Sequence, residues 1–232
     1  MVLDIPLSRV MWRPCWRIVS SLYPPQGLFD RVARPEDLET VLAIEGLTND
    51  RIRQEAGDIS LVPVEERISG PGTTPIMAAF THPNPSGSRF ADATYGVYYA
   101  AKSIDTAVSE TRFHKERFLR ATNEAPIEVD MRGYACDIDA DLHDLRGHRE
   151  SRPDVYDPDP QAYGTAQALA RSLRANDSNG IVYDSVRDPD GECIAVFRPG
   201  LLSPTLQGQH FCYVWDGEAI STIYIKSAYE KS

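Results

Sequence analysis

The chain has 232 residues, of which 42% are apolar, 34 are acidic and 24 are basic, so its formal net charge is -10. Because a domain commonly reaches roughly 250 residues before it divides, we expect a single domain over residues 1–232, with a helical and proline-rich insert at about 34–85. The acidic balance argues against direct binding to nucleic acid, since most of the surface would repel a phosphate backbone.

We expect the chain to have neither a membrane span nor an export leader. No stretch approaches the roughly 20 apolar residues of a membrane span, and the first residues lack the basic, apolar and small-residue order of a leader. We therefore expect a cytoplasmic protein without membrane contacts. The four cysteines include no CxxC pair, which favours buried thiols over disulfides or zinc, and the five histidines show no metal spacing. No metal is expected.

Apolar periodicity and turn residues predict the elements of the first half. Residues 15–20 are expected to form a short strand that ends at the turn-forming stretch Tyr23–Gly27. Apolar positions at helical spacing predict a surface helix from Pro35 to about Glu55. Five prolines between Leu61 and Pro85 indicate a loop, in which Ile76–Phe80 forms either a short helix or a strand.

The second half alternates strands, turns and helices. A buried strand at Tyr95–Ala101 precedes a helix that is capped by Ser103 or Asp105 and that carries Glu110 about two turns in. The later elements, in chain order, are expected to be a strand pair at Glu128–Ala135 and Cys136–Ile138, an exposed loop at His143–Pro160, a helix at Tyr163–Ala175, strands at Ile181–Tyr183 and Cys193–Phe197 around a turn at Asp188–Gly191, and a terminal strand pair at His210–Trp215 and Ile220–Ala228. This order predicts an α+β domain with a mixed or mostly antiparallel sheet and flanking helices.

The richest chemistry lies in the stretch 87–110, GSRFADATYGVYYAAKSIDTAVSE. Arg89 offers a planar guanidinium that matches phosphate or carboxylate oxygens, and Gly87 lets a ligand approach the backbone; the alternative is a surface arginine in a polar loop. In a strand Tyr98 and Tyr99 face opposite sides, so one packs and the other can stack on a heteroaromatic ring. We assign the ligand-facing position to Tyr99.

Two further residues have competing interpretations. Glu110 lies beside apolar helix positions, where a carboxylate is either functional or paired, and its simpler role is a surface pair with His114. Ser185 is either a turn serine or an oxygen placed beside a cleft, and no GxSxG surrounds it. The chain also lacks GxGxxG, GxxxxGK[ST] and HExxH, which removes the Rossmann, P-loop and zincin interpretations.

The order of these segments resembles the RES-domain family. The segments are WRI with Arg17, GSRF with Arg89, VYYAA, TAVSE with Glu110, and GIVYDSVRDPDGECIAVFRP with Ser185, and they extend from about Trp16 to Trp215. The resemblance implies cleavage of the nicotinamide–ribose bond of NAD, with water or phosphate as acceptor, on a fold similar to that of ADP-ribosylating toxins. NAD would be the substrate, and no cofactor is implied.

The resemblance also implies residue roles. Arg17 and Arg89 match the arginines that line the family's pocket, Tyr99 matches its strand tyrosine, Glu110 its glutamate and Ser185 its serine. The chain departs from many members in having SRFA in place of GRWN, and in having Gly164 where some carry a serine, which leaves Thr165 as an alternative to Ser185.

The same resemblance implies partners. The chain would be the toxin of a type II toxin–antitoxin pair, held by an Xre-like antitoxin that blocks the pocket, and it would assemble into homo-oligomers. Three activities stay open at this point: NAD or NADP degradation, ADP-ribose transfer to a macromolecule, and nucleotide binding without catalysis.

Overall fold

The computed structural model describes residues 5–21, 36 and 57–227. The expected turn at Tyr23–Gly27 and nearly all of the expected helix at 35–55 lie outside these residues.

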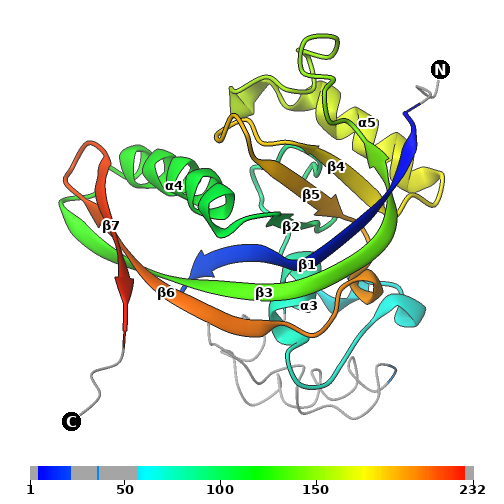
Figure 1. The fold of residues 1–232 in the computed structure, drawn as a ribbon, viewed down its shortest axis with the longest axis horizontal. Coiled ribbons are helices and arrows are strands. Elements are labelled where there is room, and N and C mark those ends of the chain that lie inside the picture. Colours follow the sequence, from blue (N-terminus) through cyan, green and yellow to red (C-terminus); the bar gives the residue numbers. More distant parts are fainter. Residues whose placement is uncertain (1–4, 22–35, 37–56, 228–232) are drawn as a thin grey trace.

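The described residues form one seven-stranded sheet and three α-helices (Figure 1). The strands are β1 (Leu7–Ser20), β2 (Tyr98–Ala101), β3 (Ile127–Asp144), β4 (Gly180–Asp184), β5 (Glu192–Val196), β6 (Leu206–Trp215) and β7 (Ile220–Lys226). The helices are α3 (Thr74–Thr81), α4 (Ile104–Ala121) and α5 (Gly164–Ala175), and four 3-10 turns are η2 (Ile59–Leu61), η3 (Val64–Glu66), η4 (Pro160–Ala162) and η5 (Pro199–Leu201). This arrangement confirms the expected α+β class.

The sheet is mostly antiparallel and partly closed on itself. Its strand order is β1-β2-β5-β4-β3-β6-β7, and only β3 and β4 pair in parallel. An additional pairing of β1 with β3 joins β1, β2, β5, β4 and β3 into a ring of paired strands. Strand β3 is long enough to pair with β1 along one edge and with both β6 and β4 along the other.

Strand β3 corrects two expectations. The strand pair at Glu128–Ala135 and Cys136–Ile138 is one continuous strand, and it extends into the expected loop at His143. The reason lies in the sequence CDIDADL, where buried residues at 136, 138, 140 and 142 alternate with exposed aspartates. On the exposed face Arg9 of β1 pairs with Asp139 and Asp141 across the strands.

Other boundaries differ more modestly. Strand β1 begins at Leu7, well before the expected start at Cys15, and Ile76–Phe80 belongs to helix α3. The expected strand at Tyr95–Ala101 is limited to Tyr98–Ala101, because the chain before it packs tightly on α3. A Cβ on Gly96 would lie only 2.3 Å from the carbonyl oxygen of Ala79.

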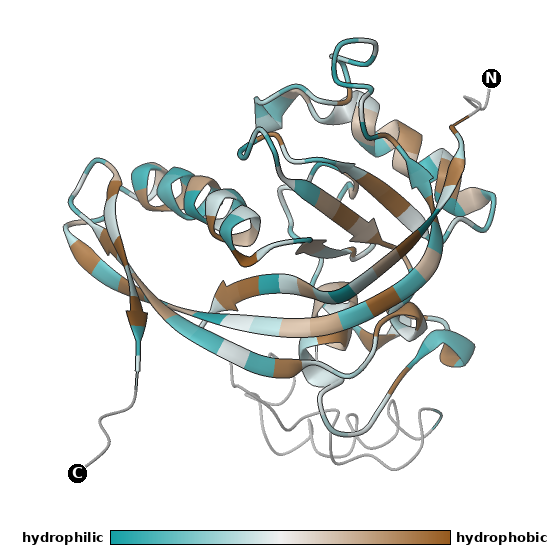
Figure 2. Cartoon of the chain, viewed as in Figure 1, coloured by the Kyte–Doolittle hydropathy of each residue, from teal (hydrophilic) through white to brown (hydrophobic). Residues whose placement is uncertain are grey.

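Two apolar cores lie on opposite faces of the sheet. One joins α4 and α5 to residues such as Met131, Phe211 and Tyr213, and the other joins α3 to Cys136 and Ile138. Strands β4 and β5 are buried on both faces, and much of their ribbon is coloured as apolar in Figure 2. The site described below lies where the two cores meet around β1 and β2.

Among the described residues, no helix combines the length and the apolar character that crossing a bilayer requires.

Candidate active site

A cavity of about 440 Å³ opens between β1, β2, α3 and α4. Its lining includes four of the five residues that the sequence singled out, Arg17, Arg89, Tyr99 and Glu110. The volume lies within the roughly 300–1,000 Å³ of small-molecule sites. Residues as far apart in the chain as Arg17 and Glu110 therefore converge on one cavity.

Helix α4 brings Glu110 to this cavity. The helix starts at Ser103, whose side chain accepts a hydrogen bond from the backbone N–H of Thr106 at 3.1 Å, so Ser103 is the cap rather than Asp105. Glu110 is half-buried, and its Oε1 accepts a hydrogen bond of 2.6 Å from the Ser185 hydroxyl. The partner that the structure gives Glu110 is thus a buried serine, and His114 is only a neighbour on the cavity wall.

Ser185 is fully buried at the end of β4, and it organises the turn formed by residues 185–191. Its N–H donates to the Gly191 carbonyl at 2.7 Å, and its Oγ accepts from the N–H groups of Arg187 and Asp188 at 3.1 and 3.0 Å. Because Oγ acts as an acceptor in both of these bonds, its hydrogen is available for the bond to Glu110. Ser185 is therefore a turn serine whose hydroxyl also donates to the Glu110 carboxylate. Neither Ser185 nor Thr165 is part of the cavity lining, but Thr165 is exposed, and Ser185 is bonded to a residue that lines the cavity.

A second bond joins α4 to the 185–191 turn. The Thr106 hydroxyl donates to Oδ2 of Asp188 at 2.6 Å, one helical turn before the Ser185–Glu110 bond. Gly191 fits closely against this pair, because a Cβ there would lie 2.5 Å from Cγ2 of Thr106 and 2.7 Å from Asp188 Oδ2. The helix face that carries Glu110 is thus fixed at two successive turns.

Arg89 reaches the cavity from a tight loop. Gly87 has a φ of +72°, which favours glycine, and the side chain of Gln167 on α5 donates to the carbonyl of Ser88 at 3.0 Å. The Arg89 guanidinium is buried, donates to the carbonyl of Val155 at 2.6 Å and lies 4.4 Å above the ring of Tyr163.

Tyr99 holds this loop in place. Its hydroxyl shares a hydrogen bond with Oγ of Ser88 at 2.8 Å and accepts one from the N–H of Phe90 at 2.9 Å. Burial raises the pKa of Tyr99 above its usual value, so the hydroxyl stays neutral. The tyrosine therefore contributes a ring to the cavity wall and a hydroxyl to the loop on either side of Arg89.

Arg17 approaches from β1. Its Nη1 donates to the Tyr99 carbonyl at 3.1 Å and its Cζ lies 4.9 Å from the centre of the Tyr98 ring, while burial lowers the guanidinium pKa. Within the described part of the chain, neither Arg17 nor Arg89 forms an ion pair. The cavity thus combines two unpaired cations with one carboxylate, which suits an anionic ligand.

Sequence reasoning missed three contributors: Tyr163, which lies under Arg89, and the Thr106–Asp188 pair. A usable signal existed for the pair, because Thr106 precedes Glu110 by four residues on the same helix face and Asp188 follows Ser185 within one turn. Nothing in the local sequence places Tyr163 beside Arg89.

Comparison with known proteins identifies the family. The model of the RES domain matches residues 65–216, a span that contains Arg89, Tyr99, Glu110 and Ser185 but not Arg17. The chain belongs to the RES-domain family. An uncharacterized protein of Sinorhizobium fredii, y4oC, is 28% identical over 211 residues, which is 90% of this chain and 86% of that protein. The RES-domain chain is also similar, with a TM-score of 0.39 and 13% identity, to a crystal structure of the M. tuberculosis MbcT-MbcA toxin-antitoxin complex, over 87% of this chain and 86% of that chain.

Proposed function

We propose that this RES-domain protein degrades NAD by cleaving its nicotinamide–ribose bond, with water or phosphate as the acceptor. The observation that carries the proposal is the Glu110 carboxylate, which is oriented by Ser185 at 2.6 Å and lines the same cavity as Arg17 and Arg89. A fixed carboxylate beside two cations fits a substrate that has an anionic pyrophosphate and a ribose that becomes positively charged as the bond breaks.

The reaction follows from these charges. When the bond between the ribose C1′ and the nicotinamide nitrogen breaks, the electron pair leaves with nicotinamide, which becomes neutral, and the positive charge passes to the ribose. Glu110 stabilises that oxocarbenium ion electrostatically. Water then attacks C1′ and releases one proton to the solvent, which yields ADP-ribose, or a phosphate oxygen attacks C1′ and yields ADP-ribose 1″-phosphate.

The remaining residues bind and orient. Arg17 and Arg89 hold the pyrophosphate, so that binding energy from the distant part of the dinucleotide aligns the scissile bond. Tyr99 forms a ring surface for nicotinamide. Ser185 acts through Glu110, because its hydroxyl already donates to the carboxylate and accepts from two backbone N–H groups. Ser185 is fully buried and is not among the residues that line the cavity, so its oxygen is not placed to attack a substrate there, whereas a positioning role needs no contact with the substrate.

In its biological setting we propose a toxin that an antitoxin of the Xre type restrains by covering the cavity. Support comes from the family assignment, together with the resemblance that the sequence already shows in the order of Arg17, Arg89, Tyr99, Glu110 and Ser185. The cytoplasm, where NAD is abundant, is the compartment that this role requires.

A product assay tests the proposal. Purified protein is incubated with NAD carrying label in its ADP-ribose part, with and without inorganic phosphate, and the products are separated by chromatography. We expect soluble ADP-ribose or ADP-ribose 1″-phosphate together with free nicotinamide. Label on a macromolecule would instead identify a transferase, and intact NAD after long incubation with saturable binding would identify a silent nucleotide-binding module.

A further inference from the structure

A third arginine lies beside the cavity. On the paired strands β1 and β3, Arg17 lies opposite Tyr134 and Val19 lies opposite Arg132. Residues opposite each other in an antiparallel pair share a face, as do alternate residues along one strand. These four residues therefore form one patch, which we call the β1–β3 patch. Arg17, Val19 and Tyr134 all line the cavity, and Arg132 lies next to them, opposite Val19.

The charge of Arg132 is not neutralised by the described residues. The side chain is only 8% exposed, its Nη1 contacts the Tyr134 hydroxyl at 3.4 Å, and its buried Nε has no hydrogen-bond partner. No carboxylate in the described ranges forms an ion pair with it, and the carboxylate of Asp130, two residues earlier, is engaged by Lys226. Buried arginines are ordinarily paired, so an uncompensated one destabilises the fold.

Buried polar atoms without hydrogen-bond partners also occur at neighbouring positions. In the described part of the chain, three buried side-chain polar atoms lack partners: Nε of Arg17, Oγ of Ser21 and Nε of Arg132. Arg17 and Arg132 belong to the β1–β3 patch, and Ser21 directly follows β1, where its N–H donates to the Asp130 carbonyl at 2.8 Å. Three unsatisfied donors, two of them on guanidinium groups, are thus concentrated at one end of two paired strands.

We propose that the β1–β3 patch binds a phosphate group, with Arg17 and Arg132 as its two cations and the Ser21 hydroxyl as a further donor. Guanidinium forks match phosphate oxygens in planar, two-point contacts, and an anion here would satisfy the donors and remove the uncompensated charge together. The phosphate is either free inorganic phosphate or a phosphate of the dinucleotide; this second source rests on the proposed function, and the first does not.

The test compares melting temperatures of the full chain with inorganic phosphate and, separately, with NAD. The variants are Arg132→Met, Arg132→Lys and the matched control Arg13→Met, which removes an exposed arginine of the same strand β1. A ligand that binds the folded state raises its melting temperature in proportion to its affinity. We expect phosphate to bind Arg132→Met at least about tenfold more weakly than wild type, Arg132→Lys to be intermediate, and Arg13→Met to match wild type.

The unliganded variants separate a binding role from a structural one. Because Arg132 has no carboxylate partner, Arg132→Met should melt no lower than wild type without ligand. If inorganic phosphate raises the melting temperature in a way that depends on Arg132, the patch binds the free anion. If only NAD does so, the patch binds a phosphate of the dinucleotide.

Two results would contradict the proposed phosphate site. One is a lower melting temperature of both Arg132→Met and Arg132→Lys than of wild type without ligand. The other is a rise in melting temperature with phosphate or NAD that is the same in wild type and in the Arg132 variants. Nicotinamide release is measured alongside. Unimpaired NAD cleavage without Arg132-dependent binding rejects the patch alone, whereas phosphate binding without cleavage rejects the proposed function alone.

Discussion

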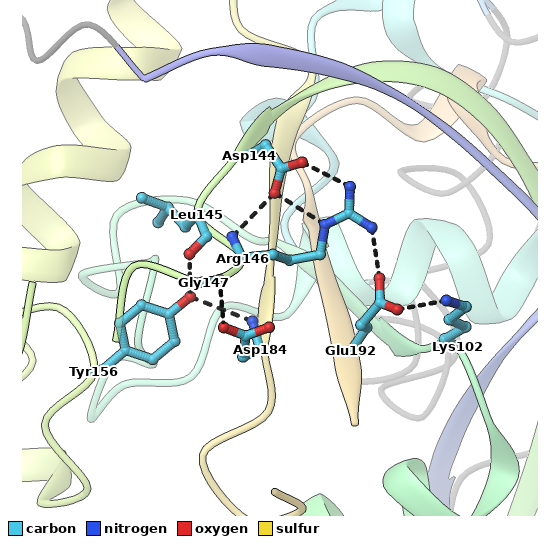
Figure 3. Close-up of polar contacts among 8 residues, drawn as sticks. All are labelled: Lys102, Asp144, Leu145, Arg146, Gly147, Tyr156, Asp184 and Glu192. Atoms are coloured by element: carbon cyan, nitrogen blue, oxygen red, sulfur yellow. Dashed lines mark hydrogen bonds and ion pairs between the residues drawn. The ribbon is translucent and has the colours of Figure 1, made fainter. Parts of the chain in front are cut away.

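Two groups of charged residues in this protein differ in whether their charges are matched. The first, which we call the polar ladder, consists of Lys102, Asp144, Arg146 and Glu192 (Figure 3). Arg146 bridges Asp144 and Glu192 at 2.6 Å each, and Lys102 pairs with Glu192, so two cations meet two carboxylates. The second is the cavity, where Arg17 and Arg89 face the single carboxylate of Glu110.

If the proposed function holds, this difference separates charges that stabilise the fold from charges that bind a ligand. The ladder links the ends of β2, β3 and β5, and its charges are paired with one another, so none is left for a ligand. Beside the ladder, the Tyr156 hydroxyl donates to the Leu145 carbonyl at 2.6 Å (Figure 3). The cavity keeps an excess of positive charge, and its carboxylate is bonded by the neutral hydroxyl of Ser185. Perturbed and unmatched charges concentrate where ligands bind, and paired networks stabilise the fold. We therefore expect substitutions in the cavity to lower activity and substitutions in the ladder to lower stability.

Replacing the cavity carboxylate should have the largest effect. Glu110→Gln keeps an acceptor for the Ser185 hydroxyl but removes the negative charge, so NAD turnover should fall by about 10²-fold or more, with an unchanged melting temperature. The rate of nicotinamide release provides the measurement. Asp105→Asn, in the first turn of the same helix, is the control and should keep full activity. Equal rates for Glu110→Gln and wild type would remove Glu110 from the reaction.

Removing the hydroxyl that orients this carboxylate should have the next largest effect. Ser185→Ala loses a hydrogen bond to a charged group, so kcat should fall about tenfold, while KM changes little because Ser185 is not part of the cavity lining. Steady-state kinetics over a range of NAD concentrations separates the two constants. The buried serine at 178, which bonds His143 instead, provides the control Ser178→Ala. A rise in KM alone would mean that Ser185 contacts the substrate.

The Thr106–Asp188 bond should contribute less, because it fixes α4 one turn away from the carboxylate. Thr106→Val keeps the shape and removes the hydroxyl that donates at 2.6 Å, so kcat should fall about fivefold, equivalent to roughly 1 kcal/mol. Thr106→Ser retains the hydroxyl and should recover most of the rate. Equal losses in both variants would indicate that packing rather than the hydrogen bond matters at this position.

The polar ladder should affect stability rather than activity. Arg146→Met removes the cation between Asp144 and Glu192, and we expect the free energy of unfolding in urea to fall by about 1 kcal/mol or less, with NAD turnover retained. A loss of turnover without a loss of stability would contradict the division into structural and functional charges.

The pH dependence of this effect has a defined sign. Burial alone would raise the pKa of Asp144 and of Glu192, but hydrogen bonds from Arg146, and for Glu192 also from Lys102, outweigh it and hold both below their usual 3.8 and 4.5. A carboxyl group with a lowered folded pKa stabilises the fold above its unfolded pKa and loses that contribution as the pH falls through the folded value. The stability difference between wild type and Arg146→Met should therefore shrink below about pH 4.5.

Local patterns in the sequence predicted much of this molecule. Helix α4, the terminal hairpin and the α+β class follow from periodicity and turn chemistry, whereas the choice of Ser103 over Asp105 as the helix cap came from the structure. Aspartates alternate with apolar residues from Cys136 to Leu142, and this alternation, taken over its full length, predicts one long strand. The predicted ends of elements were wrong where tertiary packing sets them, as at the start of β2, where Gly96 packs against α3.

The site was predictable as a set of residues but not as a geometry. Arg17, Arg89, Tyr99 and Glu110 were named from residue type, spacing and resemblance, and they do meet at the cavity. The Ser185–Glu110 bond spans 75 positions, and no local pattern encodes a contact at that separation. The unpaired state of the arginines is likewise a property of the folded surroundings, since each charge can be judged matched or unmatched only when its neighbours are placed.

A crystal structure of the Glu110→Gln variant soaked with NAD would show where the substrate lies, because NAD should bind to this variant without being cleaved. We expect the nicotinamide ribose to lie with C1′ within about 4 Å of the residue 110 side chain, and the pyrophosphate to lie against Arg17 and Arg89. NAD bound elsewhere on the protein, or bound in the cavity with its ribose turned away from residue 110, would contradict it.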